Sequence, residues 1–246
     1  MSGNAAVSPE AVLALRESRR HPRPTQFDYL YLRRMVDSLA AALGRVAGPV
    51  SDALDVYCGT RPYEDLVPAS ARYVAMDRTD YYGVADVVSE EFLPFDDESF
   101  DLVLCTEAFY YVPDPAHGVR EIQRVLRPGA TVVMTLPLVW EYNRTILVHR
   151  YTGPELAALF EGWDDVRVVE NGSRAVSWAT LTGRIVRIAE ERVPSPFGLV
   201  ARPAFALAYV AINATGALLN LLETGGSRSD YTLPMGLLVS ARRPIP

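Results

Sequence analysis

The sequence of 246 residues contains no lysine, so all 24 of its basic residues are arginines. The 30 acidic residues outnumber them and give a net charge of −6. Proteins that coat nucleic acid usually carry the opposite sign of charge, with basic residues gathered on one face. We therefore expect a partner other than nucleic acid.

Cysteine is almost as scarce, with only Cys58 and Cys105 and no CxxC pair. This count argues against a disulfide scaffold, a structural zinc site or any other metal centre, and we expect both thiols to be small buried filler. The first eight residues lack a basic start followed by an apolar run, which is the pattern of a secretory signal. We expect a cytoplasmic protein.

Two phosphate-binding patterns are also missing. The absence of GxGxxG weakens an interpretation as an NAD or FAD enzyme, and the absence of GxxxxGK[ST] leaves an NTPase loop unsupported. Hydrophobic residues make up 49% of the chain and charged residues 22%. This balance is typical of a globular protein and excludes a wholly disordered one.

Short apolar runs alternate with helical patterns in the middle of the chain. The runs cover residues 53–57, 73–76, 100–105 and 131–136, and the clearest helix covers 115–126. This alternation predicts an α/β protein with a parallel sheet covered on both faces. We expect further helices at 11–15, 26–43 and 154–160, and strands at 166–170 and 233–240.

This pattern divides the chain into four parts. We predict an N-terminal helical cap (1–49), a Rossmann-like core (50–172), a mostly helical insertion (173–231) and a closing strand of the core (232–246). Residues 203–222 of the insertion contain no charged residue and approach the length of a bilayer core. Asn213, Thr215, Gly216 and Asn220 would be costly in lipid, which favours a buried cap helix or a homodimer face over a membrane contact.

The chemistry is expected where the first strand, residues 53–57, opens into a tight turn containing Gly59. Ligands of open parallel sheets bind beyond the carboxyl ends of the strands, and glycine lets backbone approach a ligand closely. Asp77 follows the second strand about twenty residues later. A carboxylate at this position can accept hydrogen bonds from a ribose diol.

Three segments in this order resemble class I S-adenosylmethionine (SAM)-dependent methyltransferases. They are Ala53–Thr60 with Asp77, the LPF-x-D-x-SFD pattern at 93–101, and the EIQRVLRPG pattern at 121–129. Residues 59–63 further resemble a bacterial small-molecule branch with a GT-x-PY turn. The resemblance covers residues 50–170 and implies a seven-stranded sheet with an antiparallel last strand, and SAM as cofactor.

The resemblance also implies roles for individual residues. Asp55 would orient the turn and contact the methionine ammonium directly or through water, and the backbone from Tyr57 through Cys58 to Gly59 would hold the methionine part. Asp77 would bind the ribose hydroxyls. The remaining cofactor positions are Arg78 beside the adenine, Ser89 at the usual adenine-side acid with Glu90 as its substitute, and Thr106 near the sulfonium.

This chain departs from the family pattern at two further positions. The family usually has glycine where Tyr57 stands, and a side chain there could crowd the cofactor. A histidine that the family usually carries after the fourth strand is replaced by the Tyr110-Tyr111 pair. The candidates for a catalytic group are then His149, Tyr111 and Glu107.

The acceptor pocket is less defined by the sequence. We expect Tyr29, Tyr110, Tyr142 and Trp178 to line it, since aromatic faces suit a sulfonium and a flat acceptor. The sequence thus predicts methyl transfer, with O-methylation favoured, to a small molecule such as a bacterial specialised metabolite. The alternatives are a SAM-binding protein that catalyses a cyclisation or another non-methylating step, and a non-catalytic membrane-associated partner.

Overall fold

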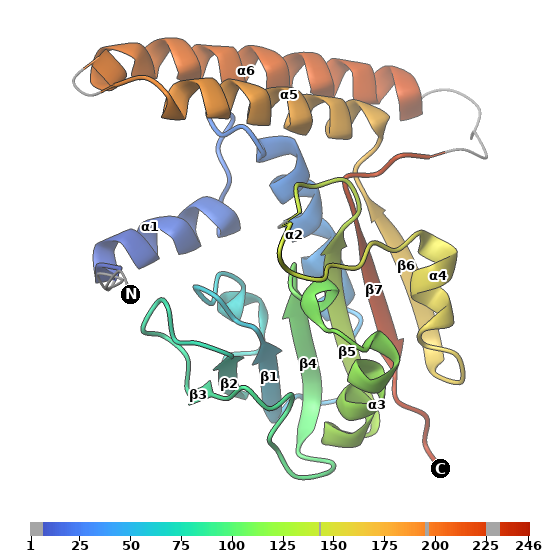
Figure 1. Cartoon of the computed structure of the whole chain (residues 1–246). Helices are drawn as coiled ribbons and strands as arrows, with labels where there is room; N and C mark the ends of the chain where they lie inside the picture. Colours follow the sequence, from blue (N-terminus) through green and yellow to red (C-terminus); the bar gives the residue numbers. More distant parts are fainter. Residues whose placement is uncertain (1–6, 143, 195–196, 225–231) are drawn as a thin grey trace.

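The computed structural model of the chain describes residues 7–142, 144–194, 197–224 and 232–246 (Figure 1). Within these residues seven strands form one sheet in the order β3-β2-β1-β4-β5-β7-β6. Strand β7 is antiparallel to both of its neighbours. The strands are β1 (Asp52–Val56), β2 (Arg72–Asp77), β3 (Val87–Val88), β4 (Phe100–Thr106), β5 (Leu126–Pro137), β6 (Asp164–Asn171) and β7 (Gly236–Arg242).

The predicted fold class is therefore confirmed, including the antiparallel last strand. Strand β3 was not predicted, because its two residues are too short to show a period. The strand order reverses between β1 and β4, which pair with each other while β2 and β3 extend the sheet on one side. This reversal leaves a crevice beyond the carboxyl ends of the strands.

Helices cover both faces of the sheet. Alternation along β1 places Leu54 in one core with α3 (Pro115–Val125) and α4 (Gly153–Ala158), and Ala53 in the other core with α2 (Tyr29–Leu43). Helix α3 begins as its sequence predicts, with the Asp114 side chain accepting a hydrogen bond from the backbone of His117 and a proline in the first turn. The two faces together bury the whole sheet interior.

The N-terminal helix α1 (Pro9–Arg20) begins as its sequence predicts, with Ser8 as the cap and Pro9 as the first helical residue, continues beyond Leu15 to Arg20, and lies over the turn after β1. Nε of Arg16 donates a hydrogen bond to the backbone oxygen of Thr60 at 2.9 Å, and Arg20 pairs with Asp65 at 2.8 Å. Asp65 belongs to the short helix η1 (Glu64–Leu66), and a second one, η2 (Phe109–Tyr111), follows β4. Helix α1 thus covers the edge of the sheet where the crevice lies.

The insertion forms a helical hairpin, α5 (Arg174–Glu191) and α6 (Phe197–Thr224), whose helices lie side by side at the top of Figure 1. The predicted helical character is confirmed for the described residues, and Asp230, near the predicted end, lies outside them. The backbone of Gly183 in α5 approaches Phe27 so closely that a Cβ would lie 2.7 Å from the Phe27 oxygen. This contact ties the hairpin to the segment that leads into α2.

Candidate active site

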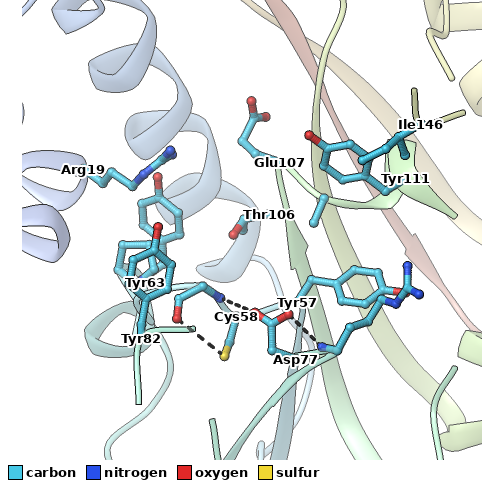
Figure 2. Close-up of a pocket in the computed structure, with 14 residues that line it drawn as sticks. Arg19, Tyr57, Cys58, Tyr63, Asp77, Tyr82, Thr106, Glu107, Tyr111 and Ile146 are labelled. Carbon is cyan, nitrogen blue, oxygen red and sulfur yellow. Dashed lines mark hydrogen bonds between the residues drawn. The ribbon is translucent and has the colours of Figure 1, made fainter. Parts of the chain in front are cut away.

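A cavity of about 480 Å³ lies at the carboxyl ends of β1, β2 and β4 (Figure 2). Its volume is within the range of small-molecule sites. Of the residues predicted for the site, the cavity brings together Tyr57, Cys58, Gly59, Asp77, Arg78, Thr106, Glu107 and Tyr111. The residues that the sequence did not indicate are Arg19, Pro62, Tyr63, Tyr82, Ala108 and Ile146.

The turn after β1 exposes backbone to this cavity. Gly59 has a φ of 53°, and a Cβ built there would meet no atom within 4 Å. The Gly59 N–H donates to Oδ2 of Asp77 at 3.1 Å, and the N–H of Arg78 donates to Oδ1 at 2.7 Å. These hydrogen bonds hold the turn against the end of β2. The Asp77 carboxylate borders the cavity and can accept further hydrogen bonds there.

Tyr57 has a φ of 58°, a left-handed conformation that is costly for a bulky residue. Its ring packs against Phe92 with a centroid distance of 6.1 Å and forms part of the cavity wall. The ring narrows the site without filling it. Strained backbone of this kind persists where surrounding structure holds it, and is frequent at functional sites.

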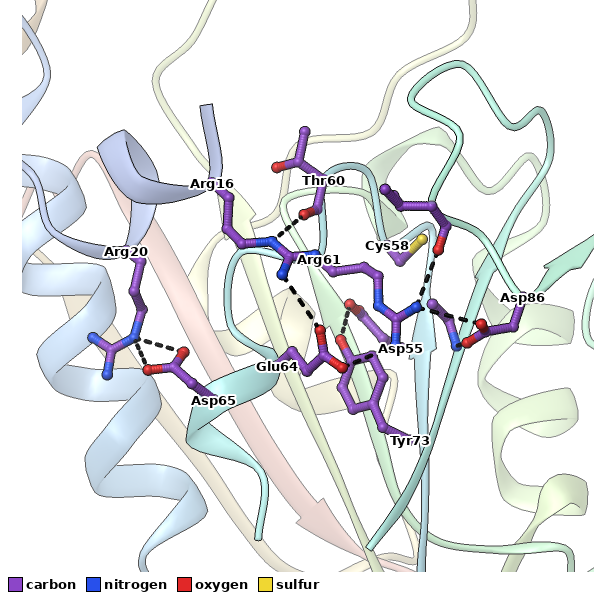
Figure 3. A network of polar contacts seen from close by, with 12 residues as sticks. Arg16, Arg20, Asp55, Cys58, Thr60, Arg61, Glu64, Asp65, Tyr73 and Asp86 are labelled. Atoms are coloured by element: carbon purple, nitrogen blue, oxygen red, sulfur yellow. Dashed lines mark hydrogen bonds and ion pairs between the residues drawn. The ribbon is translucent and has the colours of Figure 1, made fainter. Parts of the chain in front are cut away.

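Asp55 lies beneath the turn and does not line the cavity. Its carboxyl group is buried, and Oδ2 accepts a hydrogen bond of 2.5 Å from the Tyr73 hydroxyl (Figure 3). Burial raises the pKa of Asp55 to about 7. This position agrees with the predicted role of orienting the turn, and the contact with the cofactor ammonium stays a prediction.

Arg61 holds the same turn from the other side. Its guanidinium lies over the Tyr73 ring at 5.0 Å and donates to Glu64 at 3.0 Å and to the backbone oxygen of Val84 at 3.1 Å. Figure 3 shows these contacts reaching Asp86, whose Oδ2 accepts a hydrogen bond from the backbone of Ala75 in β2. The network connects the turn, η1 and the loop after β2.

Ser89 and Glu90 also lie away from the cavity. The backbone N–H of Ser89 donates to the backbone oxygen of Asp77 at 3.1 Å, and its hydroxyl accepts from Glu91 at 3.0 Å. Tyr82 lines the cavity from the preceding loop. The prediction of an adenine-side contact at Ser89 or Glu90 is therefore not met by the geometry.

Glu107 is an acid that follows β4 and lines the cavity, and its carboxyl group is buried. It has a φ of 55°, and its N–H donates to both oxygens of Thr135, at 2.8 Å to the carbonyl and 3.1 Å to the hydroxyl. Burial raises the pKa of its carboxyl group, and Oε1 has no hydrogen-bond partner among the described residues. Figure 2 shows the carboxylate between Arg19 and Tyr111, turned away from Asp77.

A smaller cavity of about 100 Å³ adjoins the first and shares Arg19 and Glu107 with it. Its other walls include Asp28 and Tyr31 from the start of α2, Tyr110 from η2, and Trp140. The Tyr31 and Tyr63 hydroxyls are buried, Tyr31 beside Glu107 and Tyr63 beside Arg19.

His149 does not reach either cavity. Its backbone N–H donates to the oxygen of Tyr110 at 2.9 Å, and its Nε2 lies 3.4 Å from the backbone oxygen of Pro113. The prediction of His149 as a base is corrected, because the ring is turned toward the backbone of the loop after η2. Of the Tyr110-Tyr111 pair, Tyr111 lines the main cavity and Tyr110 the smaller one.

Three predicted acceptor residues lie elsewhere. The Tyr29 hydroxyl accepts a hydrogen bond from Arg33 one turn along α2, and Tyr142 and Trp178 are exposed and line neither cavity. Cys58 and Cys105 are free and buried, and burial raises the pKa of both thiols. No cluster of potential metal ligands occurs in the described residues, and none was predicted.

The comparisons with known proteins agree with this geometry. Residues 43–134 match the family described as a methyltransferase domain. Over these residues the chain contains a methyltransferase domain of the class I, SAM-dependent type. The match ends within β5, so the methyltransferase family pattern includes the sheet-edge side of the cavity and leaves out Arg19, Ile146 and the α5–α6 hairpin.

A curated relative of this methyltransferase is the 27-O-demethylrifamycin SV methyltransferase of Amycolatopsis mediterranei. It is 33% identical over 119 residues, which are 41% of this chain and 43% of the relative. The chain spans about half or less of the length of the curated relatives that head the comparison. Identity of this extent supports the domain and leaves the acceptor open.

Solved structures share the fold at lower identity. The [4+2]-cyclase SpnF has a TM-score of 0.53 at 16% identity, covering 86% of this chain and 82% of the cyclase. Phosphoethanolamine N-methyltransferase 2 of Haemonchus contortus, solved in complex with SAM, has a TM-score of 0.51 at 13% identity, covering 96% and 57%. These similarities concern the fold alone.

Proposed function

We propose that this protein transfers the methyl group of SAM to a small-molecule acceptor. The observation that carries the proposal is a single cavity with two chemically different sides. On one side lie the exposed backbone of Gly59 and the Asp77 carboxylate, and on the other lies Glu107. The first side can bind a nucleoside that carries an amino-acid tail. On the second side, the Glu107 carboxylate can accept a proton from the acceptor molecule.

The residues present fit the cofactor. The Asp77 carboxylate is placed to accept hydrogen bonds from ribose hydroxyls, and the bare backbone at Cys58 and Gly59 is placed to hold the methionine part. Arg78 and Tyr57 would border the nucleoside. When bound, SAM supplies a methyl carbon activated by positively charged sulfur.

Because the carbon is already activated, the protein mainly has to hold the acceptor in line with it. Glu107 would remove the acceptor's proton, and its buried position favours this by raising its affinity for a proton. Arg19 lies beside Glu107 on the wall of both cavities and would keep the carboxylate partly ionised. An acceptor hydroxyl matches a carboxylate base of this kind, which supports O-methylation.

The acceptor class follows from the cavity walls. Tyr31, Tyr63, Tyr110, Tyr111 and Trp140 present aromatic faces with polar edges. Such a site favours a flat or partly apolar metabolite over a polynucleotide. The relative named for rifamycin methylation supports a specialised metabolite as acceptor. The expected cytoplasmic location is part of this proposal.

The cofactor assignment is tested by calorimetry with SAM and with S-adenosylhomocysteine. We expect micromolar binding of both ligands at a stoichiometry of one. Absence of heat with either ligand at millimolar concentration, in a protein whose circular dichroism shows it to be folded, would reject the cofactor.

Methyl transfer is tested separately with methyl-labelled SAM and an extract of the producing organism. We expect label in a small organic molecule. A cyclisation or other non-methylating step is the alternative, suggested by Tyr57 and by the fold shared with a [4+2]-cyclase. That alternative predicts cofactor binding without any label transfer.

A further inference from the structure

Helix α6 of the α5–α6 hairpin has its asparagines on the buried side and most of its leucines on the exposed side. In the described stretch 203–222 of α6, the polar residues Asn213 and Asn220 are buried, with Asn213 only 3% exposed. Leucine side chains of the same helix are mostly exposed, Leu207 to 69% and Leu222 also to 69%. A surface helix of a water-soluble protein shows the reverse arrangement.

Most of the buried polar groups of α6 have a partner within the protein, and Oδ1 of Asn213 is the one buried side-chain atom of this helix that lacks a partner among the described residues. Nδ2 of Asn213 donates to the backbone oxygens of Pro24 and Gln26, at 2.9 and 2.8 Å. The Ser173 hydroxyl donates to Asn220 at 2.8 Å, and the Tyr209 hydroxyl donates to Glu190 at 2.8 Å. The sequence argument against lipid counted Asn213, Thr215, Gly216 and Asn220 as costs. The fold removes this cost for Asn213, Gly216 and Asn220, which face the protein, and leaves Thr215 exposed.

Small residues allow the two helices to approach closely. A Cβ on Gly216 would lie 2.6 Å from the Cβ of Ala179 in α5 and 2.9 Å from Leu30. Close contact at small residues with hydrogen bonds between helices is typical of helices that pack in an apolar solvent. Here the same packing leaves α6 free to present its other side.

The exposed apolar side is both long and wide. Helix α6 is the one helix in the described part of the chain that is long and apolar enough to cross a membrane, with a mean hydropathy of 1.7. Only 22% of that window is buried, which distinguishes it from a core helix. At 100° per residue, the exposed positions from Leu199 to Leu222 cover roughly 200° of the circumference. Thr215 is the one exposed polar side chain between residues 203 and 222.

The charge of the hairpin differs from that of the rest of the chain. Residues 174–224 contain five arginines and three glutamates, although the whole chain carries −6. Arg192 and Arg202 are exposed where α5 and α6 connect, and they form no ion pair with a described residue. Exposed Trp178, Ile185 and Phe197 add apolar surface on the hairpin. Leucines with arginines at their border are typical of helices that lie in a membrane interface.

We propose that the outer face of the α5–α6 hairpin docks on the surface of an anionic lipid bilayer, with α6 lying in the interface. A second copy of the chain is the competing occupant of this face. A flat protein surface would contact only part of the apolar circumference of α6, whereas lipid acyl chains can adapt to all of it. The cavity lies at the carboxyl ends of β1, β2 and β4, and Figure 1 shows these strands on the inner side of the hairpin, away from its outer face.

Flotation of the full chain with vesicles of equal parts phosphatidylcholine and phosphatidylglycerol tests this proposal. We expect the protein to float with the vesicles. The triple variant Leu207→Glu, Leu218→Glu and Leu222→Glu should bind at least tenfold more weakly, since three exposed apolar side chains become charged. A matched control places glutamate at Leu13, Val88 and Ile245, which are exposed elsewhere, and should float like the wild type.

Circular dichroism and calorimetry with SAM check that both variants remain folded and bind cofactor, so vesicle binding is measured independently of the proposed function. The proposal is overturned if the wild type stays in the dense fraction. It is also overturned if light scattering shows a dimer that the α6 triple variant dissociates, because a second copy would then cover the face.

Discussion

The two sides of the cavity are built in different ways. The sheet-edge side consists of the turn at residues 57–59 and of Asp77 and Arg78 at the end of β2. The opposite side consists of residues from α1, from the segment before η1, from the end of β4 and the residues after it, and of residue 146. One side is thus determined by local chain geometry, and the other depends on how helices that are distant in sequence pack on the sheet.

This difference indicates that the two sides of the cavity bind different ligands. A backbone-defined side can change little without breaking the turn, which suits a cofactor common to many enzymes. A side made of side chains can change by substitution, which suits an acceptor that differs between enzymes. The following predictions separate the two sides.

The largest effect is expected for Glu107→Gln. Loss of a general base should lower kcat by about 10²- to 10⁴-fold, while cofactor affinity stays within about twofold. The measurement is turnover with the acceptor identified by labelling, together with calorimetry for SAM. Ser89→Ala, outside the cavity, is the control. A loss of SAM affinity as large as the loss in kcat would instead show that Glu107 binds the cofactor.

Asp55→Asn should stabilise the fold in a pH-dependent way. The pKa of Asp55 is raised from its usual value near 4 to about 7 in the folded state, so the folded protein holds this proton more tightly than the unfolded one. The carboxyl group therefore costs nothing below pH 4, and stability falls between pH 4 and about 7 as pH rises. The variant should gain up to about 4 kcal/mol above pH 7 and nothing near pH 4.

Urea unfolding across this pH range measures the gain, and Asp80→Asn on the surface loop serves as control. An advantage that is constant with pH would contradict the raised pKa. Unchanged SAM affinity in the same variant would confirm that Asp55 acts under the turn and not in the cavity.

Asp77→Ala should weaken SAM binding by about 1–3 kcal/mol, which is roughly 5- to 150-fold, because a charge-assisted hydrogen bond is lost. Calorimetry measures this loss, and Asp86→Ala tests how much comes from the turn, since Asp86 holds β2 without bordering the cavity. Equal losses in both variants would show that Asp77 only positions the turn.

The smallest effect is expected on the helical cover. Gly216→Ala should destabilise the protein by about 1–2 kcal/mol, because its Cβ would meet that of Ala179 at 2.6 Å. Gly198→Ala is the matched control, since its nearest neighbour lies at 3.6 Å, and it should be neutral or slightly stabilising. Thermal unfolding compares the two, and an unchanged melting temperature for Gly216→Ala would mean that the hairpin packs more loosely.

The local pattern of the chain predicted the α/β class and the turn on one side of the site. The buried run before Gly59 and the acid at position 77 act through neighbours in sequence or adjacent strands, and the period of a strand is a local property. The seven strands with an antiparallel last strand were implied by the resemblance to class I methyltransferases at 53–60, 93–101 and 121–129, and the structure confirms them.

Long-range packing decided the rest. Arg19 carries no local signal, and it enters the site because α1 lies over the β1 turn. His149 and Asp55 were expected in the cavity, but their side chains turn toward the loop backbone and toward Tyr73. Composition alone established that 203–222 is free of charge, whereas packing against α5 decided that its asparagines face inward and its leucines outward. Which side of a helix is covered depends on its neighbours in space, and a one-dimensional pattern does not contain them.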